Sequence, residues 1–550
     1  MDIVLVGLPG SGKSVVGKRL ANRHAATFID LDERIERSDG RPIPTIFAED
    51  GEAAFRQLER DAVADLGPAD PDPLVRRVIA TGGGAVVDPR NRWALYRGRV
   101  GVWLDGRPEV LAQRLRRSPH VRPLVTGRDP IGTLRDLAAR RERFYAATDI
   151  HVAGVADVST VVTAVEDHLE RRTAGPDAGA RLLSASTPIG RLVLGDGIAA
   201  SAIDAALSRL EARRAIVVSE PGAWEAVGTR IAGELEKRGR QVETVLLPEG
   251  EAAKRLSVIE VAASELANHH ISRGEPLVAI GGGALGDAAG FLAATFLRGI
   301  PIVHVPTSLV AQIDSSIGGK TAVDLPEGKN LVGAFHQPSD IVIDVSLLAS
   351  VPERHRRAAL GEAVKMAALG DERLFELLEQ RGDAIATGDP ASEARGDVAE
   401  LVERCAWAKV EVVVADERER AGASGRITLN LGHSLGHAVE AAAGFEALLH
   451  GEAVAYGLRA ACRIGQAVGV TPPDRSARIT AVLDRLGLAT EPLSYSVDEV
   501  LRHLALDKKH EGGRMRWVLP TADGVEVRND VPDEIVVDAA GSLLAAGSAR

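Results

Sequence analysis

The chain has 550 residues, of which 45% are hydrophobic and 26% charged, which is ordinary for a soluble globular protein and favours several domains. Its 66 basic and 77 acidic residues give a formal net charge of -11, so its charge does not point to nucleic acid or an anionic membrane as a partner. The cysteines, Cys405 and Cys462, are too few for a disulfide framework or a zinc site built from cysteine.

The N-terminal segment lacks the hydrophobic region of a signal peptide, and no apolar run reaches the roughly 18 residues of a membrane-spanning helix. We therefore expect a cytoplasmic protein without a membrane partner. Strand-like runs alternate with helical patterns as far as about Ser346, which predicts parallel sheets covered by helices. Beyond that point, amphipathic segments rich in Ala and Leu predict a helical domain.

The first motif follows the first predicted strand. The sequence "GLPGSGKS" (7–14) fits G-x-x-x-x-G-K-[ST] and precedes a helical segment. The backbone amides of such a loop bind phosphates, its lysine reaches the terminal phosphates, and its serine coordinates Mg²⁺. The sequence therefore predicts a site for ATP with Mg²⁺. The residues expected to form it are Gly10, Ser11, Gly12, Lys13 and Ser14.

Polar residues further along suggest what accepts the phosphate. Asp30 and Asp32 end a second strand, where one can help to hold Mg²⁺ and the other can orient a substrate hydroxyl, although Asp32 can instead cap the next helix. Three arginines and a glycine turn suit a small carboxylate, because guanidinium pairs with carboxylate in a bidentate way. They are Arg56, Arg122, Arg141 and the turn "TGGGA" (81–85).

Residues 1 to about 170 resemble shikimate kinase. The phosphate loop, the Asp-x-Asp, the F-R of "AFRQLE", the GGGA turn, the "RPL" lid and the "RERFY" motif occur in the family's order and spacing. The resemblance implies ATP-dependent phosphorylation of shikimate, with catalytic roles for Lys13, Asp32 and Arg122, the last in a lid over both substrates. It places Arg116 or Arg117 near adenine. The residues implied to bind shikimate are Asp32, Arg56, Gly82, Gly83, Gly84 and Arg141.

A second GGGA, in "AIGGGALGD" (279–287), follows a buried strand and begins an apolar helix, so its amides can face a pyrophosphate. The following polar segment 306–338 has neither helical nor strand periodicity. In it Asp314, Lys320 and Lys329 lie among glycines, which predicts a loop that lines a site.

Histidines are concentrated in segment 429–457. His433 and His437 are four residues apart and hence on one helical face, and His450 begins a later apolar helix. Glu362 and Lys365 lie on one face of another predicted helix, so Glu362 can add a carboxylate. Two histidines and one carboxylate with an open position form a catalytic zinc arrangement. The spacing by itself favours His433 and His437 as the histidine pair.

Residues 181–550 resemble 3-dehydroquinate synthase over nearly their whole length. The matching segments include "PEGEAAK", "GGGALGDAAGFLAATFLRG", "GKNLVGAFHQP", "LNLGHSLGHAVE", "LLHGEAV" and "DKK". The resemblance implies conversion of a heptulosonate phosphate, 3-deoxy-D-arabino-heptulosonate 7-phosphate, to 3-dehydroquinate and phosphate, with NAD and zinc or cobalt as cofactors. It implies Glu362, His433 and His450 as metal ligands and places His437 near the substrate instead.

The resemblance also implies the remaining site residues of this half. The implied NAD contacts are Glu251, Lys254, Gly282, Gly283, Asp287, Thr307 and Ser308. The implied substrate site comprises Arg298, Asp314, Lys320, Lys329, Asn330, Lys365, Lys409, Arg426, Asn430 and Lys508 or Lys509. Those with an implied catalytic role are Asp314, Lys320, Lys365, Arg426, Asn430 and His437. The segment before Arg426 is longer than the family pattern, as is the stretch between His437 and His450.

We therefore predict a bifunctional α/β enzyme. Its expected parts are an N-terminal P-loop kinase domain (1–170), a linker rich in Gly and small residues (171–180), an α/β NAD-binding domain (181–345) and an all-helical metal-binding domain (346–550). The expected partners are shikimate, ATP and the heptulosonate phosphate, with a homodimer formed through the second half. The alternatives are a different sugar-phosphate cyclase or a metal-dependent polyol dehydrogenase in the second half, or one half without catalytic activity.

Overall fold

The computed structural model describes residues 1–117, 125, 129–152, 157–171, 179–388, 393–420, 425–444, 447–506, 510–511 and 514–545. The chain forms two compact units. One comprises Met1–Ser186 and Leu192–Ile198, and the other comprises Thr187–Arg191 and Ala199–Arg550, so the division falls within one hairpin. None of the helices in the described residues is long and apolar enough to cross a membrane.

The first unit contains a five-stranded parallel sheet in the order β2-β3-β1-β4-β5. Its strands are β1 (Asp2–Val6), β2 (Thr27–Asp30), β3 (Arg77–Ala80), β4 (Val100–Leu104) and β5 (Ile150–Val152). Every residue of β1 is buried, as expected for a central strand covered on both faces. On one face, Ile3 and Leu5 pack with Leu20 and Val162 from two helices.

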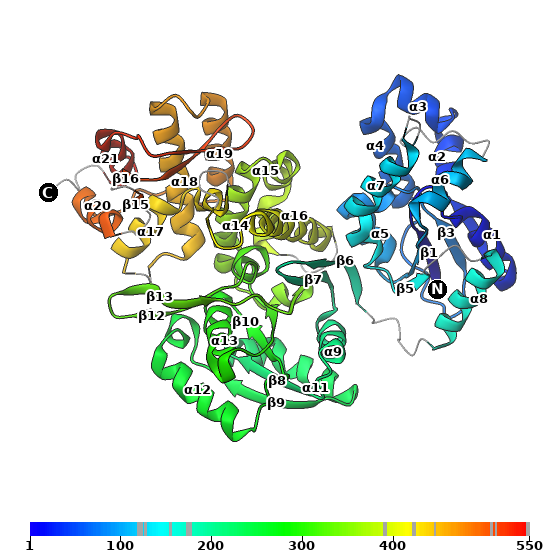
Figure 1. The fold of residues 1–550 in the computed structure, drawn as a ribbon. Coiled ribbons are helices and arrows are strands. Elements are labelled where there is room, and N and C mark those ends of the chain that lie inside the picture. The colour runs from blue at the N-terminus through cyan, green and yellow to red at the C-terminus, as the bar shows by residue number, and fades with distance from the viewer. Residues whose placement is uncertain are drawn as a thin grey trace. The chain divides into compact units, whose positions relative to one another are not determined.

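The helices of this unit follow the strands in alternation (Figure 1). They are α1 (Lys13–His24), α2 (Leu31–Asp39), α3 (Ile43–Glu49), α4 (Gly51–Ala64), α5 (Pro89–Tyr96), α6 (Pro108–Arg116), α7 (Pro130–Tyr145) and α8 (Val158–Arg171). A short 3₁₀ helix, η1 (Ala85–Val87), follows the first GGGA turn. This alternation puts the loops after β1, β2 and β3 at the carboxyl edge of one sheet, where ligands of such sheets bind.

A seven-stranded sheet in the order β6-β7-β14-β11-β10-β8-β9 organises the next part of the chain. Its strands are β6 (Ala180–Thr187), β7 (Gly190–Asp196), β8 (Arg214–Ser219), β9 (Gln241–Leu246), β10 (Leu277–Gly281), β11 (Ile302–Pro306) and β14 (Asp340–Asp344). Alternate residues of β8 face opposite sides of the sheet. Ile216 and Val218 therefore belong to one hydrophobic core, and Ala215 and Val217 to the other.

Helices cover both faces of this sheet. The first core contains residues of α12 (Leu256–Asn268) and α13 (Gly283–Thr295), and the second contains residues of α9 (Ala199–Arg209) and α11 (Thr229–Lys237). An antiparallel hairpin of β12 (Lys320–Leu325) and β13 (Gly328–Phe335) lies outside the sheet. The segment 306–338, predicted to be a loop, therefore contains this hairpin.

The last part of the chain is mainly helical (Figure 1). Its helices are α14 (Glu353–Ala368), α15 (Glu372–Thr387), α16 (Glu393–Ala415), α17 (His433–Ala442), α18 (His450–Ala467), α19 (Pro473–Arg485), α20 (Val497–Leu506) and α21 (Asp533–Gly541). The predicted α/β class with a helical C-terminal part is confirmed, but this part is not entirely helical. Strand β17 (Trp517–Pro520) is buried along its whole length and pairs with β18 (Val525–Arg528). In the turn between them, the Thr521 amide donates a hydrogen bond to the Gly524 carbonyl oxygen.

Candidate active sites

The first candidate site surrounds the loop between β1 and α1. Gly10 and Gly12 have φ of 83° and 93°, in the left-handed region that favours glycine. A Cβ on Gly7 would lie 2.5 Å from the Leu104 carbonyl oxygen, so the loop can pass β4 only with glycine there. Lys13 Nζ donates to the carbonyl oxygens of Gly7 (2.9 Å) and Leu8 (3.1 Å), which holds the ammonium group over the loop.

A cavity of about 770 Å³ extends from this loop to the first GGGA turn and is lined by side chains of α2, α4 and α7. Asp30 caps α2, accepting hydrogen bonds from the backbone amides of Asp32 (3.1 Å) and Glu33 (3.4 Å). The interpretation of Asp32 as a helix cap is therefore wrong. One residue into the helix, Asp32 lines the cavity, with Oδ1 2.8 Å from where a Cβ on Gly82 would lie.

The GGGA turn is held from two sides. Arg141 Nη1 and Tyr145 Oη, both from α7, donate to the Gly83 carbonyl oxygen at 2.8 and 2.6 Å. On the other side, a Cβ on Gly84 would lie 2.6 Å from Arg56 Nη1, so only glycine leaves space for this guanidinium. The turn therefore brings Arg56 and Arg141 to one end of the cavity.

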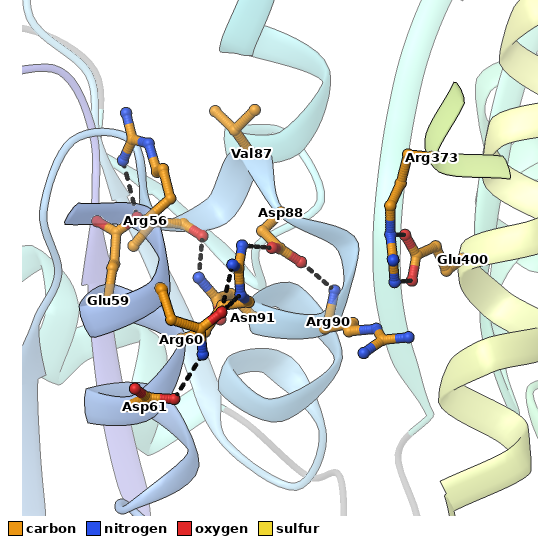
Figure 2. A network of polar contacts seen from close by, with 12 residues as sticks. Arg56, Glu59, Arg60, Asp61, Val87, Asp88, Arg90, Asn91, Arg373 and Glu400 are labelled. Carbon is orange, nitrogen blue, oxygen red and sulfur yellow. Dashed lines mark hydrogen bonds and ion pairs between the residues drawn. The ribbon is translucent and has the colours of Figure 1, made fainter. Parts of the chain in front are cut away.

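Arg56 is oriented by carboxylates of its own helix, as Figure 2 shows for Glu59. Arg56 Nη1 donates to Glu59 Oε2 at 2.8 Å, and Nη2 donates to the exposed Glu52 at 2.8 Å. Glu59 is buried, and among the described residues its Oε1 has no hydrogen-bond partner. Burial raises the pKa of Glu59 and the Arg56 charge lowers it, and the net shift is upward. The sequence analysis missed Glu59, although its position three residues after Arg56 on one helical face was a usable signal.

The second unit contains a cluster of metal-ligating side chains. The nitrogens of His433, His437 and His450 lie within 4.8 Å of one another. Glu362 Oε1 lies 3.4 Å from His433 Nε2 and 3.1 Å from His450 Nε2. Glu362 is fully buried, so both histidines meet it away from solvent. Three imidazoles and one carboxylate converging in this way fit a zinc or cobalt ion.

Glycines allow the helices that carry these ligands to approach closely. A Cβ on Gly361 would lie 2.2 Å from the Gly451 carbonyl oxygen, and one on Gly451 would lie 1.9 Å from the Ala358 carbonyl oxygen. Gly361 precedes Glu362 on α14, and Gly451 follows His450 on α18. The two helices therefore approach closely beside Glu362 and His450, which explains how residues far apart in sequence meet.

Lysines surround the cluster. Lys365 Nζ lies 2.5 Å from Glu362 Oε2, and Lys409 Nζ lies 2.7 Å from Asp314 Oδ1. Burial alone would raise the pKa of Glu362, but the charges of Lys365 and His433 hold it well below its usual value. The charges of Lys365 and Lys409 likewise overcome burial and lower the pKa of Asp314 to about 2. Both carboxylates are therefore ionised at neutral pH.

The histidines differ in their environments. Burial lowers the pKa of His433. Burial opposes protonation of His450 too, but hydrogen bonds with Glu362 and Glu440 raise its pKa to about 10. Metal binding needs the unprotonated imidazole, so a bound metal ion has to displace a proton from His450.

Several residues predicted to contact NAD lie at the carboxyl ends of β10 and β11. Gly282 caps α13, and Thr307 donates its backbone amide to the Gly281 carbonyl oxygen at 3.0 Å. Lys254 Nζ lies 2.8 Å from Asp287 Oδ2 and also donates to the Asn330 side chain. Burial raises the pKa of Asp287, although the Lys254 charge opposes this. The structure thus connects one predicted NAD residue, Lys254, with both Asp287 and the predicted substrate residue Asn330.

Comparisons with known proteins agree with both sites. A shikimate kinase family model matches residues 9–170, and models of the N-terminal and C-terminal parts of 3-dehydroquinate synthase match 244–358 and 359–510. The 3-dehydroquinate synthase of Symbiobacterium thermophilum is 44% identical over 329 residues, which cover 59% of this chain and 89% of that protein. The chain belongs to the 3-dehydroquinate synthase family. Its N-terminal part is a shikimate kinase domain.

Other relatives are consistent with this assignment. The 3-dehydroquinate synthase of Rippkaea orientalis is 40% identical over 328 residues, covering 59% of this chain and 87% of that protein. The solved structure of 2-epi-5-epi-valiolone synthase from Streptomyces hygroscopicus with NAD⁺ and Zn²⁺ bound is 28% identical, covers 64% of this chain and 96% of that one, and has a TM-score of 0.58. Both predicted resemblances are confirmed, and neither alternative reading of the second half is favoured.

Several predicted residues of the synthase have partners that the sequence analysis did not foresee. Lys320 Nζ lies 2.7 Å from Glu419 Oε2, and Asn430 Nδ2 donates to Glu419 Oε1 at 3.5 Å. Lys329 Nζ lies 3.3 Å from Glu440 Oε1. Both glutamates were missed, because a single acidic residue on a helix or turn has no distinguishing pattern.

Some residues predicted to belong to the two sites do not lie at the kinase cavity or at the cluster around Glu362. Among the described residues, Arg298 forms no ion pair with the cluster around Glu362, and its backbone is left-handed, with φ of 65°. In the kinase domain the cavity is lined by Arg114 rather than by Arg116 or Arg117, because Arg114 lies on another face of α6. Three predicted site residues lie outside the described residues, namely Arg122, Lys508 and Lys509.

Proposed function

We propose that the two sites catalyse separate reactions: ATP-dependent phosphorylation of shikimate in the kinase domain, and conversion of the heptulosonate phosphate to 3-dehydroquinate and phosphate in the synthase. The observation that carries the second assignment is the convergence of Glu362, His433 and His450 beside the buried Lys365. The first rests on a cavity that joins the phosphate loop to Asp32 and two arginines.

In the kinase domain, Lys13 and the loop amides bind the terminal phosphates of ATP, and Ser14 holds Mg²⁺. Arg56 and Arg141 bind the shikimate carboxylate at the glycine turn. Asp32 accepts a hydrogen bond from the reacting hydroxyl and takes its proton. The hydroxyl oxygen forms a bond to the γ-phosphorus as the bond from that phosphorus to ADP breaks.

In the synthase, Glu362, His433 and His450 would hold a zinc or cobalt ion, which would supply a Lewis acid for the substrate oxygen, and bound NAD would supply reversible oxidation of a substrate hydroxyl. The chain itself provides positive charge for the anionic substrate through Lys320, Lys365 and Lys409. Arg426 and Asn430 are the first and last residues of a short 3₁₀ helix, η9 (Arg426–Asn430), which directly precedes α17 and His433. His437, adjacent to both metal histidines, is placed to move a proton at the substrate.

Removal of the metal tests this assignment. We expect a chelator to abolish phosphate release from the heptulosonate phosphate and added Zn²⁺ or Co²⁺ to restore it, with kinase activity unaffected when Mg²⁺ is kept in excess. Glu362→Gln, His433→Ala and His450→Ala should each bind less zinc, measured by elemental analysis of dialysed protein. Full zinc occupancy in all three folded variants would refute the ligand set.

We propose in addition that the chain forms a homodimer through its synthase half. We also propose that its parts have the predicted limits: the kinase domain 1–170, the linker 171–180, the NAD-binding domain 181–345 and the metal-binding domain 346–550. The support is the resemblance of the second half to a dimeric family. Sedimentation equilibrium of the whole chain should give twice the monomer mass of 58.0 kDa. A monomer mass across the micromolar range would count against the dimer.

A further inference from the structure

Glu440 connects two residues that the proposed function uses for different purposes. It lies on α17, two turns beyond His433, and is buried. Its Oε2 lies 3.1 Å from His450 Nδ1, and its Oε1 lies 3.3 Å from Lys329 Nζ. One carboxylate therefore contacts both a metal-ligand histidine and a lysine of the predicted substrate site.

We propose that Glu440 is a positioning residue of the synthase: it orients the His450 ring for the metal and holds Lys329 at the substrate. This inference rests on the proposed assignment of His450 as a metal ligand. A carboxylate that accepts a hydrogen bond from the far nitrogen of a ligating histidine fixes the tautomer and the plane of the ring and makes the ligand more basic.

The two sides of the His450 ring support this role. Once a metal ion has displaced one proton, the imidazole carries one N–H, and Glu440 beside Nδ1 favours the tautomer with the proton there. Nε2 then presents its lone pair to the cluster, where it lies 3.1 Å from Glu362 Oε1. The ring is thus held between two carboxylates, with its ligating nitrogen directed at the metal site.

His433 provides an internal comparison. Its Nδ1 lies 3.1 Å from the Leu431 carbonyl oxygen, so the backbone sets the orientation of this ring. His450 begins α18 and is more exposed, and its Nδ1 is oriented by a side chain from another helix. A single substitution at Glu440 can therefore loosen the orientation of the His450 ring while every proposed ligand residue stays in the chain.

The other arm of Glu440 reaches the β12–β13 hairpin. Lys329 is the second residue of β13, and its Nζ lies 3.6 Å from Oε1 of Glu251, a predicted NAD contact. Glu440 thus joins α17, α18 and the hairpin through one side chain. Loss of its charge should affect both metal binding and substrate binding, whereas a change at Lys329 should affect substrate binding alone.

The test measures zinc affinity as well as activity. Metal-free whole chain is titrated with Zn²⁺ against a chromophoric chelator, and Co²⁺ is added separately to record its visible absorption spectrum. We expect Glu440→Ala to weaken zinc binding by about 10- to 100-fold and to change the Co²⁺ spectrum. Glu440→Gln should weaken zinc binding less, because its amide oxygen can still accept the hydrogen bond. Lys329→Met should raise the KM for the heptulosonate phosphate and leave zinc affinity within about twofold of the parent.

Glu452→Gln is the matched control, because Glu452 lies in the first turn of α18 but pairs with Arg354 rather than with a ligand. It should keep the parent's zinc affinity. Parent-like zinc affinity in both Glu440 variants, with His450→Ala losing zinc, would overturn the positioning role. Parent-like affinity in His450→Ala would instead overturn the proposed ligand set. If Glu440→Ala fails to fold, an unchanged zinc affinity and Co²⁺ spectrum in Glu440→Gln would overturn the role of its charge.

Discussion

Buried or partly buried carboxylates in both halves lie next to the arginines, lysines or histidines proposed to bind substrate or metal. Glu59 lies beside Arg56, Asp314 beside Lys409, and Glu440 beside Lys329. A buried carboxylate that loses its partner is costly, so each pair constrains both members to one geometry. These pairs therefore position the cations before the substrate arrives.

Glu59 provides a test at the scale of one residue. We expect Glu59→Gln to raise the KM for shikimate several-fold, since its amide oxygen can still accept from Arg56 but the hydrogen bond loses the second charge that makes such bonds roughly twice as strong. Glu52→Gln is the control: it removes the other carboxylate of Arg56, but that carboxylate is 54% exposed, so we expect a smaller change. Steady-state kinetics with varied shikimate decide this, and equal effects of both changes would contradict the role of burial.

The pair of Arg214 and Glu275 makes stability depend on pH. Hydrogen bonding to Arg214 lowers the pKa of Glu275 to about 2. Because the folded-state pKa lies below the unfolded value of about 4.3, the stabilisation is fully present above pH 4.3 and is lost as the pH falls towards 2. Glu275→Gln should therefore unfold at a lower temperature than the parent at pH 7, with the difference shrinking below pH 4. A difference independent of pH, measured by differential scanning fluorimetry, would contradict this.

At the scale of elements, small residues decide how closely helices approach. α14 and α18 meet at Gly361 and Gly451, and α17 meets α18 where a Cβ on Gly457 would lie 1.7 Å from the Gly432 carbonyl oxygen. The ligands Glu362, His433 and His450 are placed beside these contacts. The geometry of the metal site therefore depends on helix packing as well as on the ligands.

Substitution of Gly361 tests this dependence. We expect Gly361→Ala to reduce zinc affinity and thermal stability, because its Cβ would meet the Gly451 backbone at 2.2 Å and push α18 away from Glu362. Gly233→Ala is the control, since Gly233 lies in α11 and a Cβ there meets nothing within 4 Å. That change should be neutral or stabilise by up to about 1 kcal/mol. Parent-like zinc affinity in Gly361→Ala would show that the helices can adjust.

At the scale of the whole molecule, the described residues of the two proposed sites lie in separate compact units. Every described residue proposed for shikimate phosphorylation lies before Gly179, and every residue proposed for the synthase lies after Ala199. In the pathway that the resemblance implies, two further reactions separate the synthase product from the kinase substrate. Nothing in the chemistry requires one site to feed the other.

Reciprocal inactivation tests this independence. We expect Lys13→Ala to abolish phosphorylation of shikimate and to leave phosphate release from the heptulosonate phosphate unchanged, because Lys13 holds only the kinase phosphate loop. Glu362→Gln should do the reverse. Both reactions are measured on the same purified chain, and loss of both activities in either folded variant would show that the sites are coupled.

The sequence by itself determined both families and the phosphate loop, which is a local feature because its left-handed backbone needs glycine at fixed spacings. The proposed ligands Glu362, His433 and His450 came from the resemblance, because helical spacing by itself favours His433 and His437. Only the tertiary structure showed that Asp30 rather than Asp32 caps α2, and that Glu59, Glu419 and Glu440 contact the cations of the two sites. The partners of Glu419 and Glu440 lie on other elements, so these contacts depend on burial and helix packing, which no local pattern of residues records.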